Sequence, residues 1–233
     1  MFRFKQFSIS DERSAMKIGT DGVLLGAWAD VEGDRRILDV GTGTGLIALM
    51  LAQRNADARI TGLDLSHDAI EEASMNFAVS PWAGRLVACE CDVRRFASDE
   101  KYDHIVSNPP YFVDSLPSLD KLRTMARHTS SLTFDDLVST AERLLHDEGR
   151  LSVILPADSA MQFRFAAFGR LWLRRQTNVV TKDGEAPRRT MMEFVLQEKP
   201  IMPRIATLML RHKDNTYTEE YRHLTDEFYL SLK

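Results

Sequence analysis

Asn108-Pro109-Pro110-Tyr111 is the segment of this sequence whose residue types most directly suggest chemistry. The Asn108 side-chain oxygen and the Pro109 carbonyl are two acceptors that can hold both hydrogens of a planar amine, and Tyr111 offers a ring for stacking. Pro110 restricts Pro109 to an extended conformation, which fixes the direction of that carbonyl. This grip would draw a delocalised amine toward tetrahedral geometry and free its lone pair for attack on a methyl group.

A glycine-rich segment further upstream is the expected cofactor loop, with Gly41, Gly43 and Gly45 at alternate positions after Asp39. Dinucleotide-binding loops have the wider spacing G-x-G-x-x-G and place a phosphate on the following helix. The tighter spacing here favours a cofactor without phosphate. Asp39 could neutralise a cationic group, and S-adenosylmethionine carries both an ammonium and a sulfonium. From this loop alone, a structural turn between a strand and a helix stays an alternative.

Two further acids follow the next two expected strands. We expect Asp64 to accept hydrogen bonds from both ribose hydroxyls of the cofactor, beside Leu65, and Asp92 to accept from the adenine amine, with Val93 against the ring. Either acid alone could be a helix cap or a solvated charge. Acids at three successive strand ends, however, share the ligand-binding edge of an open parallel sheet.

Strands and helices alternate along the chain in a way that predicts an α/β fold with a doubly wound, mostly parallel sheet. Ser66 and Thr133 are the expected N-caps of two of the helices, and Gly149 is the expected end of the second one. The strands are expected at 36–40, 59–64, 85–92, 102–107 and 150–155, and the helices at 46–54, 68–79 and from 134 onward.

The segments before and after the alternating strands and helices show other patterns. Residues 171–180 and 190–197 are rich in strand formers with no helix between them, so an antiparallel hairpin at the sheet edge is expected. The first ten residues alternate like one strand, and Tyr221, Leu224 and Phe228 mark a terminal helix. We expect one domain over residues 1–233, made of an N-terminal strand and lid (1–35), a core (36–200) and a C-terminal extension (201–233).

Composition limits the function classes. Hydrophobic residues make up 44% of the chain and charged residues 27%, as in an ordinary globular protein, and no apolar run reaches membrane-spanning length. The start lacks the apolar centre of a signal peptide, so we expect a cytoplasmic protein that does not bind membranes. Cys89 and Cys91 are expected to be buried structural thiols, and no metal site is expected.

The net charge of −4 argues mildly against a nucleic-acid partner, but the charges are unevenly distributed. Residues 161–189 hold seven basic residues and two acids, a local balance of +5 that leaves −9 for the rest. This stretch could follow RNA phosphates through Arg174, Arg175, Arg188 and Arg189. A solvated surface without a ligand is the alternative.

With these motifs, the chain resembles class I S-adenosylmethionine-dependent methyltransferases of the N-P-P-Y, amino-methylating type. It is most similar to the bacterial tRNA methyltransferases that act on the N6 amine of adenine 37 in valine tRNA. The resemblance implies a Rossmann-like, seven-stranded sheet, S-adenosylhomocysteine as product, and the anticodon stem-loop as partner, with no obligatory protein partner. It rests on the glycine loop, the N-P-P-Y segment and residues 4–7, 16–28, 126–128 and 217–221.

The same resemblance places Lys17, Thr20 and Asp21 beside the cofactor as a lid, although a capped turn is the alternative for them. Pro110 and the basic side chains soon after the N-P-P-Y segment are expected at the substrate entrance. For His128 we expect a structural or RNA-phosphate role, because the proton can leave the cationic product to water. These entrance residues are Arg123, Arg127 and His128.

Other functions fit parts of the sequence. A release-factor glutamine methyltransferase would use the same N-P-P-Y chemistry, but that family has a sizeable N-terminal helical domain, and only 38 residues precede Asp39 here. Adenine methyltransferases of ribosomal RNA or DNA are the next alternatives, the DNA enzymes usually carrying an added recognition domain. A nicotinamide-dependent oxidoreductase lacks its glycine spacing here. A non-catalytic RNA-binding scaffold would not need the N-P-P-Y segment.

Overall fold

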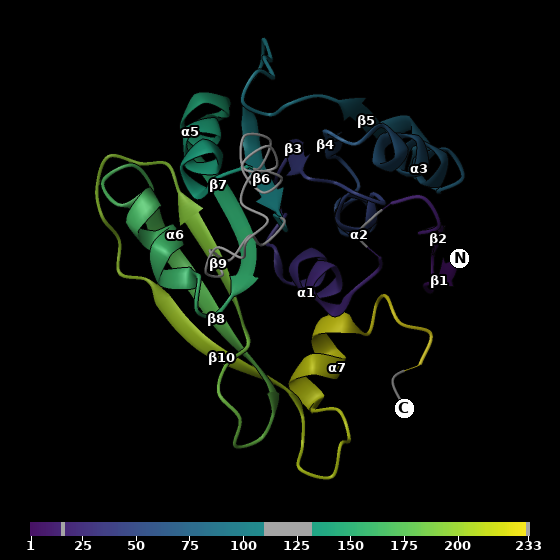
Figure 1. Cartoon of the computed structure of the whole chain (residues 1–233), viewed down its shortest axis with the longest axis vertical. Helices are drawn as coiled ribbons and strands as arrows, with labels where there is room; N and C mark the ends of the chain where they lie inside the picture. Colours follow the sequence, from purple (N-terminus) through teal and green to yellow (C-terminus); the bar gives the residue numbers. More distant parts are fainter. Residues whose placement is uncertain (15–16, 110–131, 232–233) are drawn as a thin grey trace, which may run out of the picture.

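The computed structural model describes residues 1–14, 17–109 and 132–231, which form a twisted sheet with helices on both faces (Figure 1). Its eight strands lie in the order β10-β8-β9-β7-β6-β3-β4-β5, and β9 alone among them runs antiparallel to its neighbours. The doubly wound, mostly parallel α/β fold is therefore confirmed. The strands are β3 (Arg36–Val40), β4 (Arg59–Asp64), β5 (Leu86–Glu90), β6 (Tyr102–Ser107), β7 (Leu145–Pro156), β8 (Trp172–Lys182), β9 (Arg189–Val195) and β10 (Arg204–Arg211).

The edge of the sheet differs from the prediction. The hairpin of β8 and β9 is present, with Gly184 at positive φ in its loop, but it does not form the edge. β10 pairs in parallel with β8 and takes that position, so the sheet has eight strands where seven were expected. β10 lies in the region expected to be a C-terminal extension. Of its residues only Leu208 is buried, so its place in the sheet comes from pairing with β8 more than from a buried face.

Neighbouring residues on the strands point to opposite faces, and each face is covered by its own helices. Ile37 and Val106 pack under α1 (Thr20–Trp28), α2 (Leu46–Arg54), α3 (His67–Ala78) and α7 (Glu219–Thr225). Leu38 and Ile105 pack on the other side, under α5 (Phe134–Leu144) and α6 (Ala160–Ala167). A short 3-10 helix (Ala83–Arg85) precedes β5. Two cores thus fix the strands whose carboxyl ends carry the candidate site.

Local signals placed most helix ends correctly. Ser66 caps α3, since its side chain accepts from the Ala69 backbone N–H at 3.3 Å. Thr133 and Asp136 form the expected capping box of α5. The predicted end of α5 at Gly149 is wrong: the helix ends at Leu144, and 146–149 bulge where β7 changes its register on β6.

The two chain termini pack together beside α2. The first ten residues form a small hairpin of β1 (Phe2–Arg3) and β2 (Ser8–Ile9) rather than one strand, and its turn is closed by Phe4 N–H donating to the Phe7 carbonyl. The Lys5 N–H donates to the Phe228 carbonyl at 2.8 Å. The predicted terminal helix is present as α7, and Tyr221 on it is buried. The helix ends at Thr225, however, so the buried Phe228 follows the helix and is not part of its apolar face.

Cys89 and Cys91 are free thiols, but each is half-buried, not buried as expected. Among the residues that the structure describes, no helix has the length and apolar character needed to cross a bilayer.

Candidate functional site

A cavity of about 410 Å³ opens at the carboxyl edge of the sheet, beside β3 and β6. Parallel strands bring their carboxyl ends to one edge, and the antiparallel β9 brings its first residue there. The cavity therefore joins parts of the chain that are far apart in sequence. Its lining consists of Lys17, Ile18, Gly19, Thr20, Asp21, Gly22, Gly41, Thr42, Gly43, Thr44, Leu46, Ile47, Asn108 and Arg189.

The glycine loop takes a backbone conformation that other residues rarely adopt, since Gly41, Gly43 and Gly45 all have positive φ. Gly45 is the most constrained: its φ is 83°, and a Cβ atom there would lie 2.5 Å from the Phe77 ring. The loop is also tied to β4, because the Gly41 and Thr42 N–H groups donate to the Leu63 carbonyl at 2.8 and 2.9 Å. The loop is thus held open toward the cavity.

Asp39 lies under this loop and is completely buried. Its Oδ2 accepts from the Thr42 hydroxyl at 2.7 Å, whereas its Oδ1 has no hydrogen-bond partner among the described residues. Burial raises the pKa of Asp39 to about 7; the charge of Asp64 adds to this rise, and Thr42 and the Ala48 backbone N–H oppose it. A buried acid with one unused oxygen is suited to a cationic ligand.

Asp64 ends β4 and is half-buried. Its Oδ2 accepts from the Gly43 N–H at 3.0 Å and its Oδ1 from the Ser66 N–H at 2.9 Å. Each carboxylate oxygen has further lone pairs, so the pair of ribose hydroxyls can still bind there. The neighbouring Leu65 is exposed.

Asp92 follows β5 and is bound by a neighbour. Arg94 makes a two-pronged contact with it, Nε to Oδ1 at 2.9 Å and Nη2 to Oδ2 at 2.6 Å, and this hydrogen bonding lowers the pKa of Asp92. Val93 beside it is buried. Neither residue lines the cavity in this structure, so their contact with adenine stays a prediction.

Asn108 follows β6 and lines the same cavity as the glycine loop. The strand end is fixed by the Ser107 hydroxyl, which donates to the Val40 carbonyl of β3 at 2.8 Å. Pro109 is buried. The remaining residues predicted for this part of the site lie outside the described residues: Pro110, Tyr111, Arg123, Arg127 and His128.

The predicted lid residues also line the cavity. Lys17 donates through Nζ to the backbone carbonyls of Asp11 and Glu12, and Thr20 begins α1. Asp21 forms an ion pair with Arg189, whose Nε lies 2.7 Å from Oδ2. Arg189 was expected on the phosphate-binding surface; the structure places it at the cavity instead.

Arg175 was also predicted to follow RNA phosphates, but the structure holds its guanidinium against Trp28 and Glu193. The guanidinium carbon lies 3.8 Å from the centroid of the Trp28 ring, and Nη2 lies 2.9 Å from the buried Glu193 carboxylate. Arg175 therefore balances the charge of Glu193. Arg174 lies 3.5 Å from the same carboxylate but is 46% exposed. Arg188 directly precedes β9 and is 70% exposed, with its Nε 3.6 Å from the Glu185 carboxylate.

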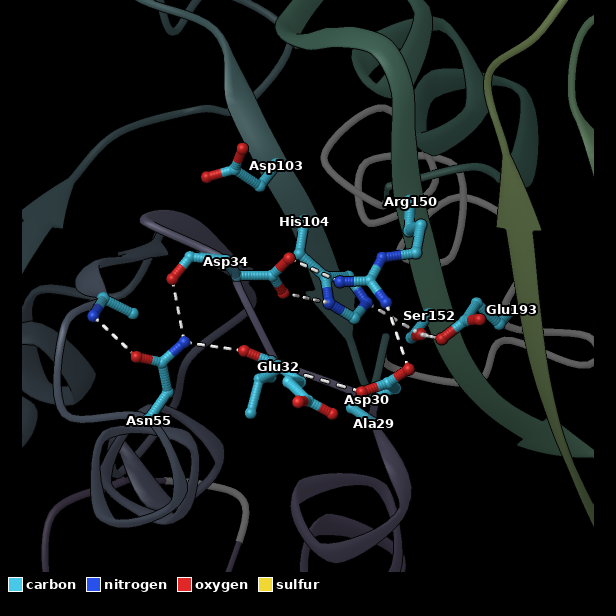
Figure 2. A network of polar contacts seen from close by, with 12 residues as sticks. Ala29, Asp30, Glu32, Asp34, Asn55, Asp103, His104, Arg150, Ser152 and Glu193 are labelled. Carbon is cyan, nitrogen blue, oxygen red and sulfur yellow. Dashed lines mark hydrogen bonds and ion pairs between the residues drawn. The ribbon is translucent and has the colours of Figure 1, made fainter.

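Sequence reasoning missed a buried polar network on the central strands of the sheet (Figure 2). His104 on β6 contacts Asp34 through Nδ1 at 3.0 Å and Ser152 through Nε2 at 2.9 Å, and Arg150 also binds Asp34. Asp34, His104 and Ser152 are linked in the same order as the Asp-His-Ser triad of acyl-transfer enzymes. All three are buried, however, so no substrate reaches the serine. The network joins β6, β7 and, through Glu193, β9.

Comparisons with known proteins give the class of this protein. Residues 14–179 match the methyltransferase small domain family. The fold is similar to a protein from Agrobacterium tumefaciens described as a predicted O-methyltransferase, with a TM-score of 0.71, 23% identity and coverage of 89% of this chain and 96% of that one. The chain belongs to the S-adenosylmethionine-dependent methyltransferases, in the methyltransferase small domain family.

Relatives that are similar over their full length show which members of that family this chain resembles. A protein from Phocaeicola vulgatus named tRNA1(Val) (adenine(37)-N6)-methyltransferase is 50% identical and covers 99% of this chain and 98% of its own length. One from Tolumonas auensis with the same name is 43% identical, with 99% and 97% covered. Similarity of this extent spans the cavity and both termini.

The residues present fit the cofactor of this class, S-adenosylmethionine. The glycine loop lines the cavity. Asp39, buried under that loop, keeps one oxygen without a hydrogen-bond partner among the described residues, and Asp64 ends the neighbouring strand. No group of three or more metal-binding side chains occurs in the described part of the chain.

The pKa of Asp39 leads to a testable result. The folded state holds the Asp39 proton more tightly than the unfolded state, whose carboxyl titrates near its ordinary value of about 3.9. Stability of the cofactor-free protein is therefore lost as the pH rises from about 4 to about 7. Asp39→Asn removes this loss, so the free energy of unfolding of the variant should exceed that of the wild type by a few kcal/mol at about pH 8 and by less at about pH 5.

Denaturant unfolding of both proteins at the two pH values measures this difference. The same variant should bind S-adenosylhomocysteine more weakly, because it lacks the negative charge. A stability difference that does not change with pH would show that Asp39 is not the titrating group.

Proposed function

We propose that this protein transfers a methyl group from S-adenosylmethionine to the exocyclic N6 amine of adenine 37 in the anticodon loop of valine tRNA. The observation that carries the proposal is the position of Asn108, which opens into the same cavity as the glycine loop. The names of the full-length relatives support the choice of tRNA and of the position. A tRNA substrate also implies a cytoplasmic protein.

The chemistry follows from the acceptors at the end of β6. S-adenosylmethionine, when bound, supplies an activated methyl group. The Asn108 side-chain oxygen and the Pro109 carbonyl accept the two amine hydrogens, hold the nitrogen in line with that methyl group and favour its tetrahedral form. No side chain has to remove the proton first, because the methylated amine is cationic and releases a proton to water.

A loop adenine suits an enzyme of this size. A base in a loop is less costly to extrude than a base in a duplex, and stacking on an aromatic ring such as Tyr111 holds it once extruded. We expect Arg188 to contact phosphates next to the cavity, because it is exposed and adjoins Arg189 at the cavity wall.

The proposal is tested by incubating the protein with labelled S-adenosylmethionine and total bacterial RNA, followed by nucleoside mapping. The expected label is N6-methyladenosine at position 37 of valine tRNA. Label in ribosomal RNA, or in a release factor when that protein is supplied, would assign the site to another substrate.

Arg188→Glu tests the phosphate surface. Losing one phosphate contact and adding a repulsive charge should weaken RNA binding several-fold and lower the slope of log affinity against log salt by about one. Arg204→Glu is the matched control. Arg204 is also exposed, but it begins the parallel strand β10 and so lies at the amino ends of the parallel strands, away from the cavity. Fluorescence anisotropy with labelled valine tRNA over a salt series measures both. Equal losses in the two variants would indicate unspecific attraction.

A further inference from the structure

Glu72 on α3 carries a completely buried carboxylate that the methyl-transfer chemistry does not use. Four donors from the N-terminal part of the chain converge on it. Its Oε1 accepts from the Ser10 hydroxyl at 3.2 Å, the Glu12 N–H at 2.6 Å and the Arg13 N–H at 3.1 Å, and its Oε2 accepts from the Ser14 N–H at 2.8 Å. One side chain therefore fixes the path of residues 10–14.

Asn76, one helical turn further, connects the same segment to the glycine loop. Its Oδ1 accepts from the Ser10 N–H at 2.8 Å, and its Nδ2 donates to the Ser10 carbonyl at 3.0 Å and to the Thr44 carbonyl at 2.9 Å. Phe77, the next residue, packs against Gly45. The face of α3 with Glu72, Asn76 and Phe77 thus holds both the N-terminal segment and the cofactor loop.

Residues 10–14 and 17–19, which we call the strap, lead from this attachment to the cavity. A Cβ atom on Gly43 would lie 3.7 Å from the Ser14 hydroxyl oxygen, so the strap runs against the glycine loop. Lys17 and Gly19 then form part of the cavity wall, and Asp21 beyond them is paired with Arg189 on β9. The strap is therefore attached to α3 at residues 10–14 and leads into α1, whose Asp21 is paired with Arg189.

We propose that Glu72 is a positioning residue for the cofactor: it seats the strap against the glycine loop and so completes the wall of the S-adenosylmethionine site. A carboxylate can accept all four hydrogen bonds, whereas glutamine keeps one acceptor oxygen and would turn its NH2 group toward at least one backbone N–H donor. Glu72→Gln should therefore unseat the strap in most molecules, and the apparent cofactor affinity falls with the seated fraction. The proposal depends on cofactor binding and not on which RNA is methylated.

Calorimetry with S-adenosylhomocysteine on the full-length protein tests the proposal directly. Glu72→Gln should raise the dissociation constant about tenfold and raise KM for S-adenosylmethionine similarly, while kcat at saturating cofactor stays near the wild-type value. Hydrogen exchange at the amides of residues 12–14 should become faster in the variant. Asp68→Asn is the matched control, since Asp68 is an exposed acid on α3, one helical turn before Glu72.

An unchanged dissociation constant in Glu72→Gln, or equal weakening in Asp68→Asn, would overturn the proposal. A second pair of variants decides the matter if Glu72→Gln does not fold. Glu12→Pro removes the N–H that donates to Glu72 from the strap side, and Glu12→Ala keeps it. The proline variant should bind S-adenosylhomocysteine more weakly than the alanine variant; equal affinities would contradict the proposed role.

Discussion

Asn108→Ala is expected to lower kcat by about a hundredfold to a thousandfold, the loss typical of removing one acceptor or donor that acts mainly in the transition state. Asn108 lines the cavity at the end of a strand that Ser107 ties to β3, so the alanine variant should keep its fold. Its affinity for S-adenosylhomocysteine should barely change, because the lost oxygen binds the amine of the substrate. Single-turnover kinetics with valine tRNA, alongside calorimetry, separates the two effects.

Asn108→Asp is a matched variant for this test, since it keeps an acceptor oxygen at the same distance from the backbone. It should retain more activity than the alanine variant. Near-normal single-turnover rates in Asn108→Ala would show that the amine is held by other groups.

Asp64→Ala is expected to weaken cofactor binding by one to two orders of magnitude, because charge-assisted hydrogen bonds contribute about 1.5–3 kcal/mol. The structure adds a second reason for this loss: the same carboxylate accepts from the Gly43 and Ser66 N–H groups and so helps to shape the glycine loop.

Asp64→Asn separates the two contributions. It keeps one acceptor for the backbone but loses the negative charge, so its affinity should lie between those of the wild type and the alanine variant. Calorimetry with S-adenosylhomocysteine gives the three dissociation constants, and wild-type affinity in Asp64→Ala would exclude the ribose contact.

The parts of the fold that could be predicted depend on neighbours in sequence. The bounds of α2, the cap at Ser66 and the capping box at Thr133 follow from local periodicity and side-chain hydrogen bonding. β10 and the end of α5 could not be predicted in this way. β10 exists through its pairing with β8, and the strand from Leu145 pairs with β6 through a bulge, and both are contacts between distant segments.

The candidate site shows the same division. Acids and glycines at successive strand ends indicated one edge of the sheet. The structure brings the glycine loop and Asn108 together in one cavity there, and Asp39 lies buried under the loop. The partners of charged side chains were not predictable, because they come from other elements. Arg189 pairs with Asp21 across the cavity, and Arg175 is held by Trp28 and Glu193.

The most direct test of the account is methylation of two purified valine tRNA transcripts, one with adenine and one with guanine at position 37. Guanine lacks the N6 amine that Asn108 and Pro109 are proposed to hold. The account predicts label from S-adenosylmethionine in the adenine transcript alone, recovered as N6-methyladenosine at position 37. Equal labelling of both transcripts, or labelling of neither, would contradict it.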